Sequence, residues 1–284
     1  MRIADQKFPP RAGWLGRLTA AALALSLMPG AVTAATGTLR IGSDISYAPL
    51  EFYAGSAKRV DGFDYDLAQE LGRHMGMRVT FANHDFNTLV KALDAGTFDA
   101  VLSAMSDTRA REKQVDFIDY FLAGSGILVV RGNPRDVFNL AGLCGLRVDL
   151  QKGTSQQSAL ENQSKSCTGV HLGAVRVAAF GTDADALKAL LAGKSDAHVS
   201  DYPVVAYLAK TLGNGTSYEV AGRQFGVVPY GIAVAKGRSS MRDHLQRALQ
   251  ATIRDGSYDR LLKKWGLQQG AMRSAPVNAG TLFQ

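Results

Sequence analysis

The 284-residue sequence lacks a long apolar segment and the common catalytic signatures. Its one strongly apolar stretch, Leu18–Met28, is about half the ~20 residues that a helix needs to cross a bilayer, which excludes a polytopic membrane protein. The motifs HExxH, GxSxG and GxxxxGK[ST] are absent, and the five histidines form no metal-spaced cluster. We therefore expect no metal and no other cofactor. The 46% hydrophobic and 20% charged content describes an ordinary globular chain and excludes disorder.

The apolar stretch has the surroundings of an export signal. Four basic residues and one acid precede it, and Pro29 is followed by small residues in which Val32 and Ala34 have signal-peptidase spacing. We interpret residues 1–34 as a signal peptide cleaved near Ala34, which predicts a periplasmic protein. The alternative is a buried helix of the fold. No cysteine follows the stretch, so a lipid anchor is not expected.

Much of the apparent basicity belongs to this leader. Without residues 1–34, the chain has 28 basic and 24 acidic residues, and its net charge falls from +7 to +4. The remaining Lys and Arg are scattered, and no segment interleaves bases with aromatics as a single-strand groove does. Nucleic acid is therefore not an expected partner.

Cysteine is scarce, and the two that occur are Cys144 and Cys167. In an oxidising compartment such a pair is usually bridged, and closing this loop would stabilise the fold by roughly 3 kcal/mol. Two buried thiols, or half of a metal site, are the alternatives. Since no CxxC motif or nearby histidine cluster supports a metal, the sequence favours a disulfide.

Strand-like and helix-like patterns alternate along the chain, which predicts an α/β fold with largely parallel sheets. The strand-like runs are 39–45, 78–81, 100–103, 126–131, 146–150, 175–180, 197–200 and 231–235. The helix-like runs are 66–75, 86–95, 183–192, 202–212 and 241–254.

An internal repeat sharpens this interpretation. KALDAGTFDAVLS, Lys91–Ser103, matches KALLAGKSDAHVS, Lys188–Ser200, at eight of thirteen positions without a gap. Each copy has a helix end, a glycine stop and a short strand that begins with Asp-Ala. Chance can produce a match this short, but the repeat favours two similar lobes, each with its own sheet.

Ligands of open parallel sheets bind beyond the carboxyl ends of the strands. Beyond the first copy, Ser106, Thr108 and Arg111 stand at a loop-to-helix junction, where hydroxyls, amides and a guanidinium suit an anion. Alternatively, Arg111 is a surface residue paired with Glu112 or Asp107.

The second lobe offers two comparable features. Gly153-Thr154-Ser155 is either a simple turn or an amide nest for the same anion. Asp201 is either a helix N-cap or the acceptor for an ammonium group. If both lobes face one cleft, the anion site of the first lobe and Asp201 of the second can bind the two charged ends of one small zwitterion.

Several segments, in order, resemble the extracellular solute-binding proteins of ABC importers for polar amino acids, family 3, over about Leu39 to Leu267. Residues 62–71 resemble the signature GFDxDLxxxL, with Tyr65 departing from the usual aliphatic residue. The other matching segments are 106–111 (SxTxxR), 152–155 (xGTT), 200–203 (D-x-P), 230–237, 256–258 and 264–266.

This resemblance implies a two-lobed α/β periplasmic-binding-protein fold (type II) and roles for matching residues. Arg111 would hold the α-carboxylate of an amino acid with Ser106 and with Ser155 or Thr154. Asp201 would hold the α-ammonium, helped by the backbone at Ser103. The residues implied around the ligand side chain are Tyr47 and Phe86 as a sandwich, Asp44 and Gln151 at its tip, and Ala104 where some relatives carry a hydroxyl.

The resemblance also implies two hinge crossings and a membrane partner. Lobe 1 would comprise residues 35–124 and 226–284, and lobe 2 residues 125–225. Closure around the amino acid would be recognised by the permease subunits of an ABC importer, with the carrier itself a monomer. Asp44 suits a basic side chain, whereas Gln151 equally suits a glutamine amide, so the amino acid stays open.

Two other functional classes compete with a binding protein. A dehydratase acting on prephenate or arogenate is known on this scaffold, but it needs a general acid in a cleft without an ammonium partner. A receptor-kinase sensor would need a second hydrophobic span and a cytoplasmic domain, and neither is present before Gln284. We therefore expect a binding protein and no enzyme.

Overall fold

The computed structural model describes residues 37–56 and 59–283. The expected signal peptide and its cleavage point lie outside these residues. Among the described residues, no helix combines the length and apolar character needed to span a bilayer.

Lobe 1 is organised around three parallel strands. Strand β1 (Gly37–Ser43) lies between β5 (Met77–Asn83) and β6 (Ala100–Val101) and is parallel to both. Leu39 and Ile41 of β1 are fully buried, as their alternating apolar pattern predicts.

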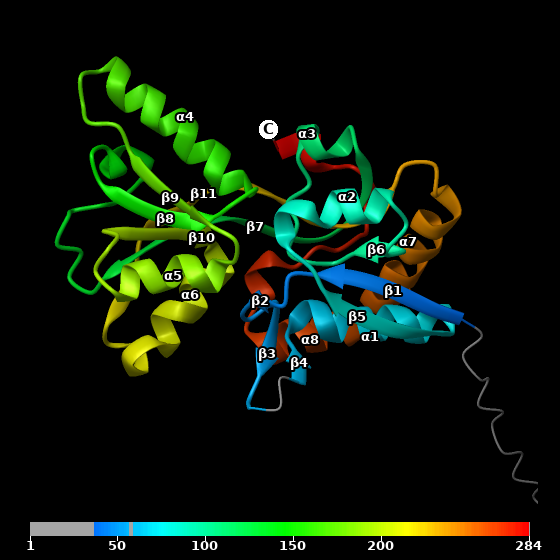
Figure 1. Cartoon of the computed structure of the whole chain (residues 1–284). Coiled ribbons are helices and arrows are strands. Elements are labelled where there is room, and N and C mark those ends of the chain that lie inside the picture. Colours follow the sequence, from blue (N-terminus) through cyan, green and yellow to red (C-terminus); the bar gives the residue numbers. More distant parts are fainter. Residues whose placement is uncertain (1–36, 57–58, 284) are drawn as a thin grey trace, which may run out of the picture. The chain divides into compact units, whose positions relative to one another are not determined.

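Lobe 2 repeats this arrangement. Strand β8 (Arg147–Gln151) lies between β9 (Arg176–Phe180) and β10 (Ala197–Asp201), again with parallel pairing. The predicted α/β fold with two lobes and largely parallel strands is therefore confirmed (Figure 1).

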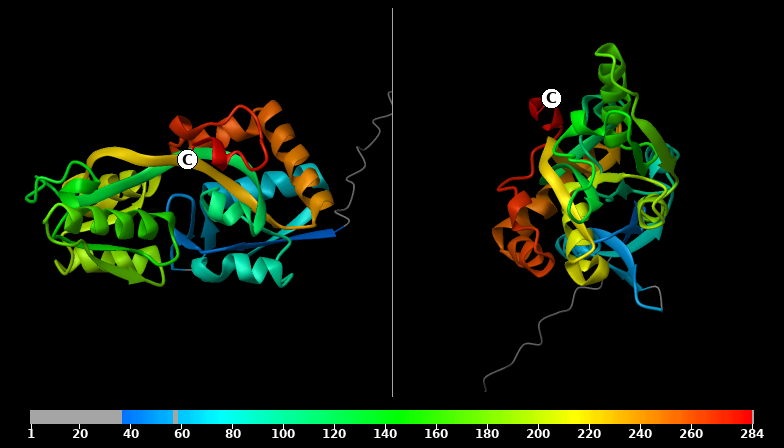
Figure 2. Two further views of the ribbon diagram at one scale, coloured as in Figure 1. Left: turned by 90° about the horizontal axis from the view of Figure 1, so that it is seen from above. Right: turned by 90° about the vertical axis from the view of Figure 1, so that its left-hand side faces the viewer.

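Two long strands connect the lobes. Strands β7 (Val115–Val130) and β11 (Tyr218–Ala235) pair antiparallel with each other; β11 also pairs with β6, and β7 with β10. The hydrogen-bonded order is thus β5-β1-β6-β11-β7-β10-β8-β9, one sheet rather than the two separate sheets that the repeat suggested. Figure 2 shows the two strands running side by side.

Helices cover the strands in both lobes, and a small antiparallel sheet lies beside β1. The helices of lobe 1 are α1 (Phe63–Met75), α2 (Leu89–Asp94), α3 (Arg109–Glu112), α7 (Ser239–Arg254) and α8 (Ser257–Trp265). The small sheet contains β2 (Ser46–Tyr47), β3 (Glu51–Ala54) and β4 (Arg59–Asp61). Single 3-10 turns occur at η1 (Phe86–Thr88), η2 (Leu140–Leu143), η3 (Leu212–Gly215), η4 (Gln268–Gly270) and η5 (Gly280–Phe283).

In lobe 2, α4 (Ser155–Gly169) lies on one side of the strands, and α5 (Asp183–Leu191) and α6 (Tyr202–Thr211) lie on the other (Figure 1). Helix α4 was not predicted because it has no apolar stripe. Only Gln156, Leu160 and Cys167 of α4 are buried.

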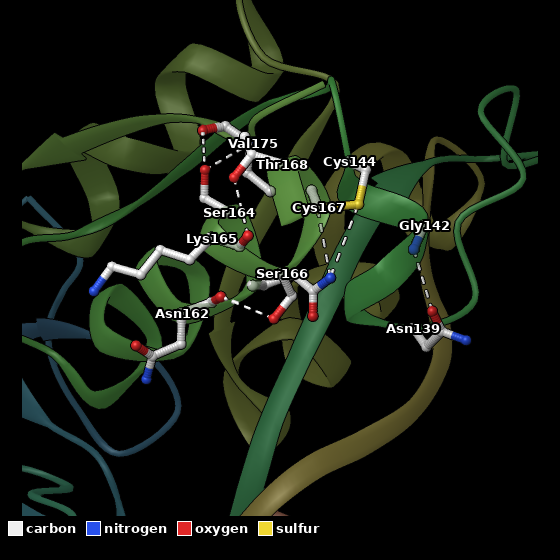
Figure 3. The surroundings of a disulfide bond; sticks show 11 residues. Asn139, Gly142, Cys144, Asn162, Ser164, Lys165, Ser166, Cys167, Thr168 and Val175 are labelled. Carbon is white, nitrogen blue, oxygen red and sulfur yellow. Dashed lines mark hydrogen bonds between the residues drawn. A yellow bond between two sulfur atoms is a disulfide. The ribbon is translucent and has the colours of Figure 1, made fainter. Parts of the chain in front are cut away.

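The predicted disulfide is confirmed. Cys144 and Cys167 are bonded, with their Cα atoms 5.6 Å apart (Figure 3). Cys167 is buried in the apolar core of lobe 2 with Leu143, Val148 and Leu160. The bond therefore fastens α4 to the segment that leads into β8.

The segment after α8 stays in lobe 1 and pairs with β7 through bridges at Ala271 and Val277. Its backbone amides at Ala279 and Gly280 donate to the carboxylates of Asp119 (3.0 Å) and Asp107 (2.8 Å). Because Asp107 directly follows Ser106, this segment fixes the loop that enters the site described next.

Candidate functional site

A small pocket lies between the lobes, near the carboxyl ends of β8 and β10 and the loop after β6. Its lining includes nine residues that were predicted from sequence: Tyr47, Phe86, Ala104, Ser106, Arg111, Gln151, Thr154, Ser155 and Asp201. One further lining residue, Gln156, was not predicted. Asp44 and Ser103 are not in the lining, but they lie buried against residues that are.

Arg111 provides the positive charge of the pocket. Its guanidinium donates to the carbonyl oxygens of Ser106 (2.9 Å) in lobe 1 and Gly153 (3.2 Å) in lobe 2, and it lies 5.4 Å from the ring centre of Phe86. Desolvation lowers the pKa of Arg111 to about 10, so it stays a cation at neutral pH. Among residues 37–56 and 59–283, no ion pair joins it to a carboxylate.

The hydroxyl groups near Arg111 fall into two kinds. The Thr108 hydroxyl caps α3 by accepting a hydrogen bond from the backbone amide of Arg111. The Thr154 hydroxyl caps α4 by accepting one from the backbone amide of Gln157. Ser106 and Ser155 instead approach each other across the cleft, with their Oγ atoms 3.4 Å apart. Ser155 also donates to Gln156 Oε1 (3.3 Å). The two serines are therefore the hydroxyls that face each other beside Arg111.

Asp201 provides the negative charge. It stands at the start of α6 but its side chain makes no capping hydrogen bond. Instead, its carboxylate accepts from the Tyr47 hydroxyl (2.8 Å) in lobe 1 and from the Gln156 amide (2.7 Å). Burial raises the pKa of Asp201 to about 6, despite these hydrogen bonds. The carboxylate is thus held, desolvated, facing the pocket.

Gln156 has a role that the sequence interpretation missed. Its amide nitrogen donates to Asp201 and also to the Ser125 hydroxyl (3.0 Å) on β7. The NH₂ group therefore occupies a donor position on the carboxylate, as an ammonium would. Gln156 is one of two consecutive glutamines in the first turn of α4, which is no distinctive sequence pattern, so only the structure identifies its role.

Asp44 and Gln151, which the family resemblance placed at the tip of the ligand side chain, contact each other across the cleft. The Gln151 amide donates to Asp44 (2.5 Å) and to the carbonyl of Gly181 (3.2 Å). Burial raises the pKa of Asp44, and hydrogen bonds from Ser46 and Gln151 oppose this shift. A carboxylate and a carbonyl therefore accept at one end of the site.

The loop at Ser103 and Ala104 is held by hydrogen bonds to buried carboxyl groups. Ala104 has a positive φ of 43°, a conformation that costs energy for an alanine. Its amide donates to Asp64 (2.9 Å), which also accepts from Tyr120. Burial raises the pKa of Asp64 to about 7. Asp64 belongs to the GFDxD segment, whose sequence suggested a family but no contact.

Ser103 faces inward rather than into the pocket. Its hydroxyl donates to the buried Glu51 (2.8 Å) and accepts from the backbone amide of Asp44 (3.0 Å). Ser103 thus fixes the position of Asp44.

A buried network supports the lobe 2 side. His198 Nδ1 lies 2.5 Å from Asp149, and its Nε2 lies 3.4 Å from Asp183. Burial alone would lower the pKa of His198, but the two carboxylates outweigh burial and raise it to about 10. Asp183 accepts from Ser200 (2.8 Å), which is 2.9 Å from the Tyr47 hydroxyl. His198 is therefore a buried cation that supports the strand leading to Asp201.

The family model of the bacterial extracellular solute-binding proteins, family 3, matches residues 39–268. An arginine-binding protein of an Escherichia coli ABC transporter is 30% identical over 252 residues, which cover 88% of this chain and 98% of that protein. A glutamine-binding protein of a Bacillus subtilis ABC transporter is 31% identical over 215 residues and 74% of each chain. The structure of an ancestral arginine-binding protein bound to arginine superposes with a TM-score of 0.74 at 34% identity, covering 81% of this chain and 99% of that one.

Proposed function

The chain belongs to the bacterial extracellular solute-binding proteins of family 3, and from this premise we propose that it is the substrate-binding component of an ABC importer for a free polar amino acid. The observation that carries the proposal is that Arg111 of lobe 1 and Asp201 of lobe 2 line one pocket. A cation and an anion presented by opposite lobes match the two charged ends of a zwitterion. The named relatives are transport binding proteins rather than enzymes.

Both ends of the ligand need a partner in this pocket, because an unpaired buried ion is costly. The α-carboxylate binds Arg111 together with the hydroxyls of Ser106 and Ser155. The α-ammonium binds Asp201 in the donor position that Gln156 now occupies. Charge-assisted hydrogen bonds contribute about 1.5 to 3 kcal/mol each, so a few of them reach the ~8 kcal/mol of a micromolar site.

The ligand side chain extends between Tyr47 and Phe86 towards Asp44. The Asp44 carboxylate and the Gly181 carbonyl, both acceptors, favour a basic side chain such as that of arginine, lysine or ornithine. The Gln151 amide could instead pair with the amide of glutamine. A basic amino acid is our first choice and glutamine the second.

The ligand closes the lobes by bridging groups that belong to different ones. The crossings lie within β7 and β11, near residues 124–125 and 225–226, with lobe 1 made of 35–124 and 226–284 and lobe 2 of 125–225. Near these positions the β7–β11 register shifts on both sides of Phe225. The permease subunits would recognise the closed monomer in the periplasm, after the signal peptide is cleaved near Ala34.

Isothermal titration with the twenty amino acids and ornithine tests this proposal. We expect micromolar or tighter binding of one or a few polar amino acids, with one site per chain. The Arg111→Ala variant should bind about thirtyfold more weakly, because a carboxylate loses its charged partner. Lys113→Ala, which removes an equal charge from an exposed position two residues away, is the matched control and should bind like the wild type.

Two outcomes would contradict the proposal. One is the absence of binding by every amino acid in a folded protein. The other is turnover of prephenate or arogenate, which would show a dehydratase on this scaffold.

A further inference from the structure

A second and larger cavity, of about 650 Å³, lies between the lobes beside β7 and β11. Helix α6 of lobe 2 forms one wall with Tyr202, Ala206 and Lys210, and lobe 1 forms the opposite wall with Trp265 and Leu267. Residues 121–123 of β7 and Glu219, Val220 and Gln224 of β11 also line it. No described residue lines both this cavity and the amino-acid pocket. The cavity is therefore separate from the site described above.

The two cavities nevertheless share the same two segments of chain. Tyr47 lines the amino-acid pocket and Pro49 lines the larger cavity. In the same way, Asp201 lines the pocket and the next residue, Tyr202, lines the cavity. Movement of one lobe against the other must therefore change both spaces together.

The chemistry of the lining indicates what the cavity suits. The rings of Phe121, Tyr202 and Trp265 supply apolar surface. Lys210 is exposed and, among the described residues, its ammonium group forms no hydrogen bond or ion pair. Glu219, the one carboxylate among the described residues of the lining, is ion-paired with Arg131 at 3.6 Å. An apolar wall beside an uncompensated cation fits a small molecule with an aromatic or aliphatic body and one anionic group.

The volume and position fit a ligand site as well. Cavities of 300–1,000 Å³ between domains, mostly apolar with a few polar groups, are typical of small-molecule sites. This cavity exists while the Tyr47 hydroxyl bonds Asp201 across the cleft at 2.8 Å. An occupant that fits it therefore binds the closed arrangement of the lobes and stabilises that arrangement.

We propose that this cavity is a second ligand site, for a small amphiphilic anion, and that its occupancy favours closure of the amino-acid pocket. The coupling rests on the proposed function, whereas the site itself does not. By thermodynamic reciprocity, the anion and the amino acid each tighten the binding of the other by the same factor.

The site is tested first without any amino acid, with 8-anilinonaphthalene-1-sulfonate as the probe, because it combines aromatic rings with a sulfonate. We expect saturable binding with one probe per chain, read from its fluorescence. Ala206→Trp fills the cavity and should weaken probe binding at least tenfold. Lys210→Glu reverses the exposed charge and should weaken probe binding at least fivefold. This variant keeps the test decisive if the tryptophan variant fails to fold.

Lys165→Glu is the matched control, since it reverses an exposed charge on α4, whose residues do not line the cavity. It should bind the probe like the wild type. Equal probe affinity in the wild type, Lys210→Glu and a folded Ala206→Trp variant would overturn the site.

The coupling is tested by repeating the probe titration with the preferred amino acid at saturation. We expect at least threefold tighter probe binding, and the same factor when the probe is saturating and the amino acid is titrated. Unchanged or weaker binding would overturn the coupling. If no amino acid binds at all, the proposed function and the coupling fail together, while the first titration still decides the site.

Discussion

The two copies of the repeat, Lys91–Ser103 and Lys188–Ser200, occupy equivalent places in the two lobes. Each copy runs from the end of a helix, through a glycine with positive φ, into a parallel strand. The glycines are Gly96 (φ 75°) and Gly193 (φ 65°), a conformation that glycine adopts without steric cost. The repeated sequence thus encodes one local structure twice.

The resemblance extends to the ionic contacts that each copy makes with an arginine outside it. Asp99 accepts from the backbone amide (2.9 Å), Nε (3.1 Å) and Nη2 (2.8 Å) of Arg40 at β1. Asp196 accepts from the same three groups of Arg147 at β8, at 2.9, 3.1 and 2.9 Å. Each aspartate therefore holds the neighbouring strand in its lobe through the same three groups, and Asp196 has a further ion pair with Arg135 at 3.3 Å.

The copies also end alike, with a serine that donates to a buried carboxyl group. Ser103 donates to Glu51 and Ser200 to Asp183, both at 2.8 Å. Beyond these serines the two copies lead to different residues, the first to Arg111 and the second to Asp201. The comparison teaches that the repeat builds the scaffold, while the residues that follow it decide which charge each lobe presents.

The largest expected effect concerns stability, because only lobe 2 contains a disulfide. Replacing both Cys144 and Cys167 by serine should lower the free energy of unfolding by about 3 kcal/mol. Amino-acid affinity should change less than twofold, because neither cysteine lines the pocket. Urea unfolding and calorimetry measure both, with Ser166→Ala as the control. A large loss of affinity at unchanged stability would contradict this structural role.

The second effect concerns the charges that distinguish the lobes. Arg111→Ala and Asp201→Asn should each weaken binding about thirtyfold, equivalent to about 2 kcal/mol. Ligand analogues separate the two ends. Replacing the ligand carboxylate by an amide should change the affinity of Arg111→Ala only slightly. Removing the ligand ammonium should likewise change the affinity of Asp201→Asn only slightly. Identical responses of the two variants to both analogues would contradict the division of charge between the lobes.

A smaller effect follows from the pKa of Asp201, which burial raises to about 6. In the proposed site only the ionised form of Asp201 pairs with the ligand ammonium, so the affinity should be highest well above pH 6 and should fall as the pH drops through 6. At pH 5 the affinity should be about tenfold weaker than at pH 7. Asp201→Asn should lose this part of the pH dependence, and calorimetry at both pH values measures it. Retention of the full tenfold change in that variant would assign the titration to another group.

Without ligand, the stability of the fold should change with pH in the direction opposite to the affinity, so that it falls as the pH rises. The pKa of Asp201 is raised on folding, so ionisation disfavours the folded state once the pH rises above the unfolded value of 3.8. The wild type should therefore lose stability relative to Asp201→Asn between about pH 4 and pH 6, measured by urea unfolding at each pH.

The smallest expected effects come from the two matched clamps. Asp99→Asn and Asp196→Asn should each lower stability by about 1 kcal/mol, because half-exposed arginine partners contribute modestly. Hydrogen bonds from Arg147 lower the pKa of Asp196 to about 2, so its contribution is present above the unfolded pKa and is lost as the pH falls towards 2. Denaturant unfolding that separates the two variants by several kcal/mol would contradict the equivalence of the clamps.

The sequence predicted the elements that have clear periodicity. The expected helix 183–192 is α5 at Asp183–Leu191, and the expected strand 39–45 overlaps β1 at Gly37–Ser43. Helix α4 was missed because its stability comes from a capping threonine and a disulfide rather than an apolar stripe. The full lengths of β7 and β11 were also missed, since pairing between strands a hundred residues apart leaves no local pattern.

For the site, the motifs indicated most of the residues that line the pocket, but not the residues that hold them in place through hydrogen bonds. Arg111 and Asp201 stand in recognisable segments, and the structure places both in the pocket. Gln156 lacked a pattern of its own, and Asp64 carried no visible reason to contact Ala104. Such contacts join residues that are distant in sequence, so they appear only after the chain has folded.

A crystal structure with the preferred amino acid bound tests the central claim most directly. We expect the ligand carboxylate on the guanidinium of Arg111, beside Ser106 and Ser155, and the ligand ammonium on the carboxylate of Asp201. A ligand that contacts one lobe only, or whose charged ends lie away from these two side chains, would contradict the account.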